Sequence, residues 1–342
     1  MKEDPPEIRN TTNGESDLIH TPPEFAIAEG DIHVLPEDEY VAGTSLWKDA
    51  WRRLLKNKLA VFGLIVVTLT AIISLIGPPL IKWATGYTYD YIPSDVMLIK
   101  SIPPFKSAAG SFSWSHPMGT DNSGRDLLAR VLLGGRISLM VGIISTFVSL
   151  IIGVSYGAIA GYLGGRIDNW MMRIVDVLYS LPYVILVIVL LAVFRSSTAV
   201  GQLILLFVAL GSVSWLTMAR IVRGQVLSLK NQEFVLAARA TGVSTGRIIF
   251  RHVVPNTLGP VIVYATLTIP QVMLTEAFLS FLGFGVQPPL ASWGSLAAEG
   301  IQNIGIFPWQ LIFPGVTMAL TLFSLNFLGD GLRDALDPQM RT

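Results

Sequence analysis

The sequence contains no cysteine, few charged residues and no excess of either sign of charge. Without Cys among its 342 residues, the chain can form no disulfide bond, thiolate nucleophile or sulfur-ligated metal site. Its four His are far apart and lack the His-Glu-x-x-His spacing of zinc hydrolases. The 24 Lys and Arg balance 24 Asp and Glu, so no basic field attracts the phosphates of a nucleic acid. These absences predict a chain with no catalytic residues, no bound cofactor, no metal site and no nucleic-acid partner.

Apolar residues are abundant, and six apolar stretches are long enough to cross a membrane. Hydrophobic residues make up 51% of the chain and charged residues 14%, whereas soluble domains carry about 25% charged residues. The first stretch, 59–81, has no charged residue before its end and spans roughly 35 Å as a helix. The sequence therefore predicts an all-α, polytopic membrane protein with six transmembrane helices. The other five expected spans are 137–163, 174–194, 200–219, 253–282 and 310–328.

Two segments of different composition precede the first span. Residues 1–45 contain eleven Asp and Glu, two basic residues and five Pro, which predicts an acidic, disordered tail. This segment lacks the basic start and apolar run of a cleavable secretion signal, so we expect it to stay on the mature protein. Residues 46–58 are basic and aromatic with helical spacing, which predicts an amphipathic helix lying in the membrane interface.

The distribution of Lys and Arg predicts the orientation in the membrane. With a cytoplasmic amino terminus, the segments on the cytoplasmic side carry 15 basic residues and those on the outer side carry 7. We therefore expect both termini to be cytoplasmic. After the helix at 46–58 and the first span, the membrane region 46–342 then continues with an extracytoplasmic segment, 82–136, a five-span core, 137–330, with a cytoplasmic segment at 220–252, and a cytoplasmic tail, 331–342.

The cytoplasmic segment 220–252 is much longer than a connection between two spans requires. Residues 233–241 are good helix formers, and Gly242 follows where a left-handed cap would end a helix. Ser244 can cap a second helix that leads through Arg247 and Arg251 to Pro255. The segment is therefore expected to fold as helix, turn, helix.

One face of the first short helix suits docking to another protein. Phe234, Ala237, Ala238 and Thr241 lie at positions i, i+3, i+4 and i+7, so they share a face that is small apart from Phe234. Such a helix can lie deep in a groove of a partner. The simpler alternative is a hairpin that caps the bundle. Three charged residues beside the face could set the register of a docked helix: Glu233, Arg239 and Arg247.

This segment resembles the coupling motif of permease subunits of binding-protein-dependent ATP-binding-cassette importers. The family consensus is Glu-Ala-Ala, three residues, Gly, nine residues, Ile-x-Leu-Pro. Ala237, Ala238, Gly242 and Pro255 stand at matching intervals. The chain departs from the consensus at three positions, where it has Leu236, His252 and Val254.

Further stretches, spread over about 45–342, are similar to the second membrane subunit of the oligopeptide and dipeptide permeases. They include a Gly-Thr-Asp-Asn-Ser-Gly-Arg-Asp run at 119–126, Ser-Phe-Leu-Gly-Phe-Gly at 280–285, and Asp-Gly-Leu-Arg-Asp-Ala-Leu-Asp-Pro at 330–338. The acidic leader lies outside this resemblance. The run at 119–126 is the best approximation to a phosphate-binding loop, but it has Arg125 in place of Lys and Asp126 in place of a hydroxyl residue.

The resemblance implies a type I importer permease fold in the inner membrane of a bacterium. It implies that the chain works with a second permease, two cytoplasmic ATPase subunits that bind ATP and Mg, and an extracytoplasmic peptide-binding protein. The cargo it implies is a peptide. Dipeptides, longer peptides, murein fragments and a peptide-like metal chelator such as a nickel carrier all stay open. A secondary transporter, a channel and an intramembrane enzyme are the distant alternatives, because no inverted repeat, filter sequence or nucleophile and base pair is visible.

Two features inside the predicted spans attract attention. Gly153, Gly157 and Gly161 form a stripe without side chains, which predicts close helix packing and leaves open whether the contact slides. Glu276, next to Thr275, is a costly intramembrane carboxylate that should face a partner or a wet cavity. It could meet the amino end of a peptide in the translocation pathway, or pair with a cation of the partner permease.

Charged and aromatic residues at the span ends complete the expectations. Asp168, Arg173 and Asp176 suggest charge pairing at the interface. Trp293, Glu299 and Trp309, in and beside the outer segment 283–309, suggest either a landing surface for a binding protein or an interfacial aromatic belt.

Overall fold

The computed structural model describes residues 46–92 and 100–336. The predicted tail 1–45 and residues 337–342 lie outside the described residues. Within the described ranges the chain is helical apart from turns, loops and two isolated antiparallel bridges. The described residues form one compact unit.

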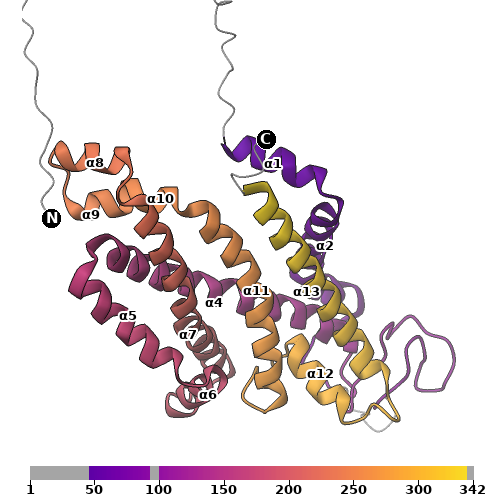
Figure 1. The fold of residues 1–342 in the computed structure, drawn as a ribbon. Helices are drawn as coiled ribbons and strands as arrows, with labels where there is room; N and C mark the ends of the chain where they lie inside the picture. Colours follow the sequence, from indigo (N-terminus) through magenta and orange to yellow (C-terminus); the bar gives the residue numbers. More distant parts are fainter. Residues whose placement is uncertain (1–45, 93–99, 337–342) are drawn as a thin grey trace, which may run out of the picture. The chain divides into compact units, whose positions relative to one another are not determined.

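Five helices of the described chain are long and apolar enough to cross a membrane. They are the helices α2 (Lys58–Thr85), α4 (Leu127–Leu163), α7 (Ala199–Leu229), α11 (Leu258–Phe281) and α13 (Trp309–Leu336). Figure 1 shows them as the long coiled ribbons of the bundle. An all-α, polytopic fold is therefore confirmed.

The sixth span differs from its expected form. The stretch 174–194 is divided between α5 (Gly165–Tyr179) and α6 (Tyr183–Val193), which are bent by 85°. Pro182 lacks a backbone N–H and disfavours helical geometry at the residue before it, Leu181, which favours a break here, whereas the prolines inside α2, α11 and α13 leave those helices continuous. The prediction of a continuous span was wrong at this point, although the pair together has the apolar length of one span.

Helix α4 begins ten residues before the expected span. Its 37 residues extend roughly 55 Å, which is well beyond the hydrocarbon thickness of about 30 Å. Asp126 caps the helix by accepting from the Ala129 N–H at 2.8 Å. The last part of the expected extracytoplasmic segment 82–136, from Leu127, is therefore helical. Arg130 can lie inside this helix because Asp121 and Glu299 pair with its charge within the protein.

Helices α1 (Leu46–Lys56) and α13 pack together at one end of the bundle. Leu54, Ala60 and Ala335 belong to one buried apolar cluster. The residues 331–336, expected in a cytoplasmic tail, thus continue α13 and pack on α1 and α2. The prediction of a helix at 46–58 is confirmed over its first eleven residues, with Asn57 separating it from α2.

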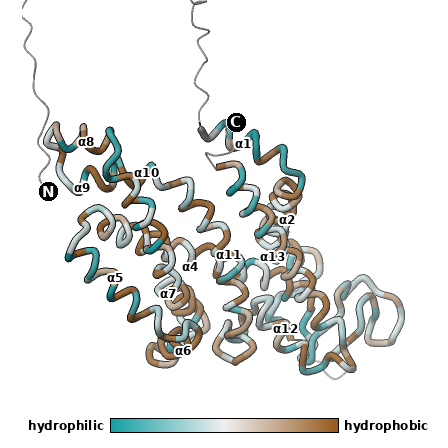
Figure 2. The backbone as a smooth tube through the Cα atoms, in the orientation of Figure 1, coloured by the Kyte–Doolittle hydropathy of each residue, from teal (hydrophilic) through white to brown (hydrophobic). Residues whose placement is uncertain are grey.

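The other described helices are short and lie at the two ends of the bundle. Near the end that holds α1 come α8 (Glu233–Ala240), α9 (Thr245–Arg247), the π-helical turn η1 (Ile248–Val253) and α10 (Val254–Asn256). At the opposite end lie α12 (Trp293–Ile301) and the loop that precedes α4 (Figure 1). Figure 2 shows a hydrophobic α6 and a largely hydrophilic α1. The location of α1 in the membrane interface stays a prediction.

Helices α4 and α7 make the most extensive contact among the described helices, along the predicted glycine stripe. A Cβ on Gly153 would meet Met218, one on Gly157 would overlap the carbonyl oxygen of Ala219, and one on Gly161 would crowd Val226. Only a residue without a side chain lets the two backbones approach so closely. The structure therefore places all three glycines in helix packing; whether the contact slides stays a prediction.

Candidate coupling segment and translocation pocket

The predicted cytoplasmic segment is a compact hairpin at the end of α7. Its first ten residues, 220–229, continue α7 as helix, so the loop is shorter than expected. Helix α8 ends at Ala240, and Gly242 has a φ of +77°, the left-handed cap that the sequence predicts. Ser244 stands before α9, but its side chain makes no capping hydrogen bond, so that part of the prediction was wrong. The backbone carbonyl of Ser244 instead accepts from the Ile248 N–H at 3.0 Å.

The structure divides the predicted docking face of α8. Phe234, Ala237 and Thr241 are exposed, whereas Ala238 is only 9% exposed. Ala238 packs with Val235 in an apolar cluster that includes residues of α7 and η1. The expectation that Ala238 belongs to a bare outer face was wrong, because Val235 and Ala238, three residues apart, form the inward side of the helix.

The charged residues around α8 fall into two groups. Arg239 donates to the Tyr162 hydroxyl at 3.3 Å and lies over its ring, which ties α8 to the end of α4. Glu233 and Arg247 are exposed and make no ion pair within the described part of the chain. The exposed side of the hairpin therefore retains one acidic and one basic group that can pair with another protein.

Two ion pairs join α7 to α5 just beyond the hairpin. Arg223 donates to both carboxylate oxygens of Asp168 at 2.5 and 2.6 Å, and Arg220 donates to Asp176 at 2.9 Å. The Arg220 guanidinium also lies 4.2 Å from the centre of the Tyr179 ring. The predicted charge pairing at the start of α5 is thus present for both aspartates, although Arg173 takes no part in it.

A cavity of about 520 Å³ opens beside the break between α5 and α6. Its walls come from the break itself, from the middle of α7 and from the middle of α11, and they carry no charged side chain. Tyr183 and Ser214 lie within hydrogen-bonding distance of each other, at 3.2 Å, on adjacent walls. The polar lining residues are neutral hydroxyl and amide groups: Tyr179, Ser180, Tyr183, Ser214, Thr217, Tyr264, Thr268, Gln271 and Thr275.

Thr275 and Glu276 have different surroundings. Thr275 lines the cavity, but Glu276 is 1% exposed and points into the protein. Its Oε1 accepts hydrogen bonds from Ser280 at 2.6 Å and from Ser292 at 2.7 Å. Neither expected environment, a wet pathway or a cation of another chain, matches this position. The signal that could have found it is the Ser at i+4 on the same helix.

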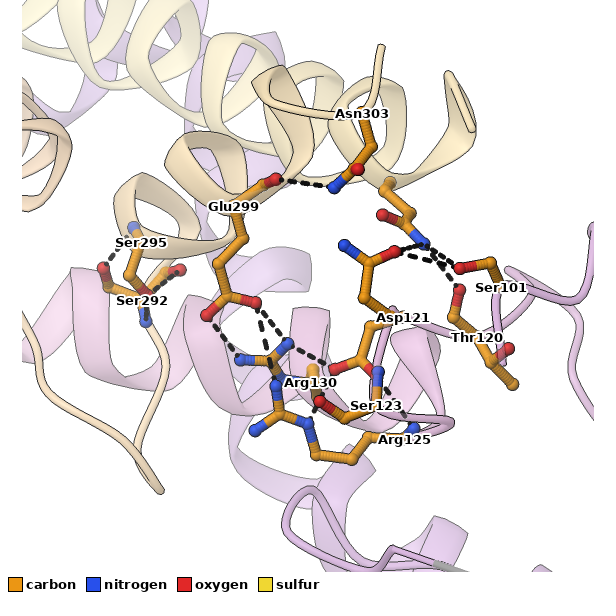
Figure 3. Close-up of polar contacts among 12 residues, drawn as sticks. Ser101, Thr120, Asp121, Ser123, Arg125, Arg130, Ser292, Ser295, Glu299 and Asn303 are labelled. Carbon is orange, nitrogen blue, oxygen red and sulfur yellow. Dashed lines mark hydrogen bonds and ion pairs between the residues drawn. The ribbon is translucent and has the colours of Figure 1, made fainter. Parts of the chain in front are cut away.

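A network of charged residues closes the opposite end of the bundle (Figure 3). Arg130, 1% exposed, donates to Asp121 at 2.6 Å and to the two oxygens of Glu299 at 2.7 and 3.0 Å. Arg125 donates to the same Asp121 oxygen at 2.6 Å. The network joins the loop before α4 to α12. Sequence reasoning missed it because Arg130 and Glu299 are 169 residues apart in the chain.

The tryptophans expected on an outer surface are not exposed. Trp293 is 2% exposed and donates from Nε1 to the Val131 carbonyl at 2.9 Å. Trp293 belongs to a buried apolar cluster, and the half-buried Trp309 packs against that cluster. The suggestion that they form a landing surface or an aromatic belt was wrong for Trp293. Among the described residues no cluster of His, Asp and Glu is placed to hold a metal ion.

Comparisons with known proteins identify the family to which the chain is similar. The family model described as binding-protein-dependent transport system inner membrane component matches residues 153–342, and the N-terminal TM domain of oligopeptide transport permease C matches residues 45–104.

Among curated relatives, the chain is 47% identical to the oligopeptide transport system permease protein OppC of Haemophilus influenzae over 89% of this chain and 92% of the relative. It is 49% identical to OppC of Escherichia coli strain K12, over 88% and 94%. It is 45% identical to the dipeptide transport system permease protein DppC of Bacillus subtilis, over 87% of each. A solved structure of the MetNI methionine ABC transporter in an inward facing conformation matches with 20% identity and a TM-score of 0.49, over 62% of this chain and 96% of that one.

Proposed function

This chain belongs to the family of binding-protein-dependent transport system inner membrane components, and on that premise we propose that it carries peptides across the inner membrane as one permease of a two-permease pathway. It is a multi-pass inner-membrane permease subunit of an ATP-binding-cassette importer. The names of its relatives, oligopeptide and dipeptide permeases, support peptide cargo over nickel, murein fragments or another peptide-like solute. No observation favours a secondary transporter or a channel.

The proposed assembly contains a second permease, two cytoplasmic ATPase subunits and an extracytoplasmic binding protein. Family membership supports this composition. ATP and Mg are bound by the ATPase subunits, since the sequence of this chain offers no phosphate-binding loop with a Lys. The subunit itself is proposed to be non-catalytic, with its six-span bundle in the membrane between the binding protein and the motor.

The neutral cavity between α5, α7 and α11 is proposed as this chain's half of the translocation pathway. A transporter of varied peptides gains little from a strong ion pair with any one side chain. Hydroxyl and amide groups can instead exchange hydrogen bonds with the backbone N–H and C=O groups that every peptide has. The second permease is proposed to supply the other wall of the pathway.

The α8 hairpin is proposed to transmit the motor's movement to this cavity. Its outward side, with Phe234 and Ala237, docks on an ATPase subunit, and its inward side packs on α7. From there Arg220 links α7 to Asp176 and to Tyr179, which lines the cavity. A displacement of the hairpin therefore moves a wall of the pathway, and two arrangements of this unit give alternating access.

The proposal depends on one observation: α8 has one exposed side and one side that packs on the protein. The variant that tests the proposal therefore changes the exposed side alone. Ala237→Trp places a large side chain on the exposed side and leaves the inward packing of Val235 and Ala238 intact. We expect ATP-dependent peptide uptake in reconstituted vesicles to be lost while the thermal stability of the permease pair stays unchanged. Ala237→Ser, which keeps a small side chain, should retain uptake.

A second substitution separates docking from folding. Ala238→Trp must disturb the apolar cluster beneath α8, so it should lower the melting temperature as well as uptake. Normal uptake by Ala237→Trp, with ATPase subunits still bound, would remove α8 from the docking surface.

A further inference from the structure

The loop before α4 carries three aromatic side chains that the transport proposal does not use. We call residues 100–116 the aromatic loop. Phe105, Phe112 and Trp114 are 38%, 69% and 72% exposed. The loop is nonetheless folded, because the Ser113 N–H donates to the Phe105 carbonyl at 2.9 Å and the Ser107 N–H donates to the Ser111 carbonyl at 2.8 Å. Ordered backbone with exposed aromatic rings is typical of a surface that contacts something apolar.

The three rings form one patch. The rings of Phe105 and Phe112 are stacked with their centres 6.2 Å apart, and the Trp114 ring stands nearly perpendicular to both, at 5.3 and 5.6 Å. Phe105 has a φ of +57°, which a bulky residue rarely adopts. This unfavourable backbone conformation occurs at Phe105, whose ring is part of the exposed patch.

The base of the aromatic loop lies at the end of a membrane span. The His116 ring is 5.1 Å from the ring of Tyr87, which follows the left-handed cap of α2 at Gly86. The last turns of α2 carry Lys82 and the 84% exposed Trp83. Trp, Tyr and Lys at the end of a span mark the level of the lipid headgroups. The aromatic loop therefore leaves the bundle at headgroup depth, at the end opposite α8 (Figure 1).

The composition of the aromatic loop suits the same environment. Residues 100–116 include Lys100 and Lys106 but no Asp or Glu, so the loop is attracted to anionic headgroups. The exposed apolar side chains of α2, such as Ile76 and Leu80, continue toward it as a surface that faces lipid. The aromatic patch lies on a loop that begins beside this lipid-facing surface, so a protein partner would have to displace lipid to bind it.

We propose that Phe105, Phe112 and Trp114 insert into the lipid interface on the extracytoplasmic side and anchor the aromatic loop to the membrane. The same loop continues into Asp121 and Arg125, which hold Arg130 and α12. The anchor and the charged network therefore fix the extracytoplasmic segment from two sides.

The absence of cysteine from the chain makes a direct test possible. A single nitroxide is attached at Phe112→Cys, with Ile72→Cys on the lipid-facing side of α2 and Gln302→Cys after α12 as references. The transporter, with cysteines of its partner chains replaced, is reconstituted in vesicles of phosphatidylethanolamine and phosphatidylglycerol. Paramagnetic resonance then compares the accessibility of each label to oxygen, which enriches in lipid, and to a water-soluble nickel complex.

The proposal expects the label at position 112 to have more contact with oxygen and less with nickel than the label at 302, with values between those of the labels at 302 and 72. A label at 112 that behaves like the one at 302 overturns it. So does a label that is aqueous alone and becomes shielded from both reagents on addition of the binding protein, since the patch would then dock a protein.

A second measurement needs no label. Lipids brominated near the headgroup should quench tryptophan fluorescence, and the quenched component should fall with Trp114→Phe. Equal quenching of the wild-type protein and Trp114→Phe would also overturn the membrane anchor.

Discussion

The two ends of the described bundle are held by different forces. At the end with α8, apolar packing of Val235 and Ala238 fixes a hairpin whose outer side keeps unpaired charges and small residues. At the end with α12, Arg130 binds Asp121 and Glu299 in a network that is largely closed within the chain. The α8 end keeps some groups free for a partner beside its ion pairs between α5 and α7, and the α12 end uses the charges of its network to hold itself together.

This difference teaches how to separate docking residues from scaffold residues. A group that is already paired inside the chain must lose an internal contact before it can bind another protein, and that loss opposes binding. Phe234, Ala237, Glu233 and Arg247 have no such contact to lose. Substitutions on the α8 side should therefore affect transport more than stability, and substitutions in the Arg130 network should do the reverse.

The largest effect on stability is expected from Arg130→Met. Removing this guanidinium leaves the buried Asp121 carboxylate with one partner fewer and Glu299 without its bidentate donor, at a cost of about 3 to 5 kcal/mol. Thermal unfolding of the permease pair in nanodiscs should show a lower midpoint. Glu299→Gln, at a position 44% exposed in its side chain, is the milder control. A midpoint unchanged by Arg130→Met would contradict the scaffold role of the network.

A smaller loss is expected from Gly157→Ala, which tests the close packing of α4 against α7. The new methyl group would overlap the Ala219 carbonyl, so α4 and α7 must separate, at about 1 to 3 kcal/mol. Gly224→Ala on α7 is a matched control, because a Cβ there meets no atom within 4 Å. The control should be neutral or stabilise by up to about 1 kcal/mol. Equal melting temperatures for both variants would mean that the glycine stripe does not set the helix separation.

The next smaller effect on stability is expected at the ion pairs between α5 and α7. These substitutions should also affect the coupling of ATP hydrolysis to peptide uptake. Asp168→Asn weakens the two hydrogen bonds from Arg223, and a double-mutant cycle with Arg223→Gln should give a coupling energy of about 1 kcal/mol. Peptide uptake per ATP hydrolysed should fall, since α5 no longer follows α7. Asp176→Asn, in a pair exposed on both sides, should cost less stability. Unaltered coupling in Asp168→Asn would argue against transmission through α5.

Sequence patterns predicted the elements governed by local chemistry. The uncharged run at 59–81 and the left-handed Gly242 depend on neighbouring residues only, and the structure has both. The errors have long-range causes. The charge of Arg130 places it outside the membrane unless its pairing with the distant Glu299 is known. Likewise, Ala238 belongs to an exposed face of an isolated α8, and only the packing of η1 against α8 buries it. The break at Pro182 has a local cause, but a proline within an apolar stretch does not tell a tolerated residue from a sharp bend.

The smallest effect is expected from Glu276→Gln, and it decides whether the carboxylate near the end of α11 is part of the scaffold or of the pathway. Both serine hydroxyls donate to one oxygen of Glu276, and a glutamine has one such acceptor, so the two hydrogen bonds can survive. Ser292 then keeps its orientation as the cap of α12, where its Oγ accepts from the Ser295 N–H.

We expect a stability change below about 1 kcal/mol, with uptake and peptide preference unchanged. Glu276→Leu should be worse, since two buried hydroxyls lose their acceptor at about 1 to 3 kcal/mol each. Uptake competition between peptides with free and acetylated amino ends is the deciding measurement. If Glu276→Gln alters that preference, the carboxylate contacts the peptide in a transport state and belongs to the pathway with Thr275. If Thr275→Val alters uptake and Glu276→Gln does not, the pathway ends at the cavity wall and Glu276 is part of the scaffold.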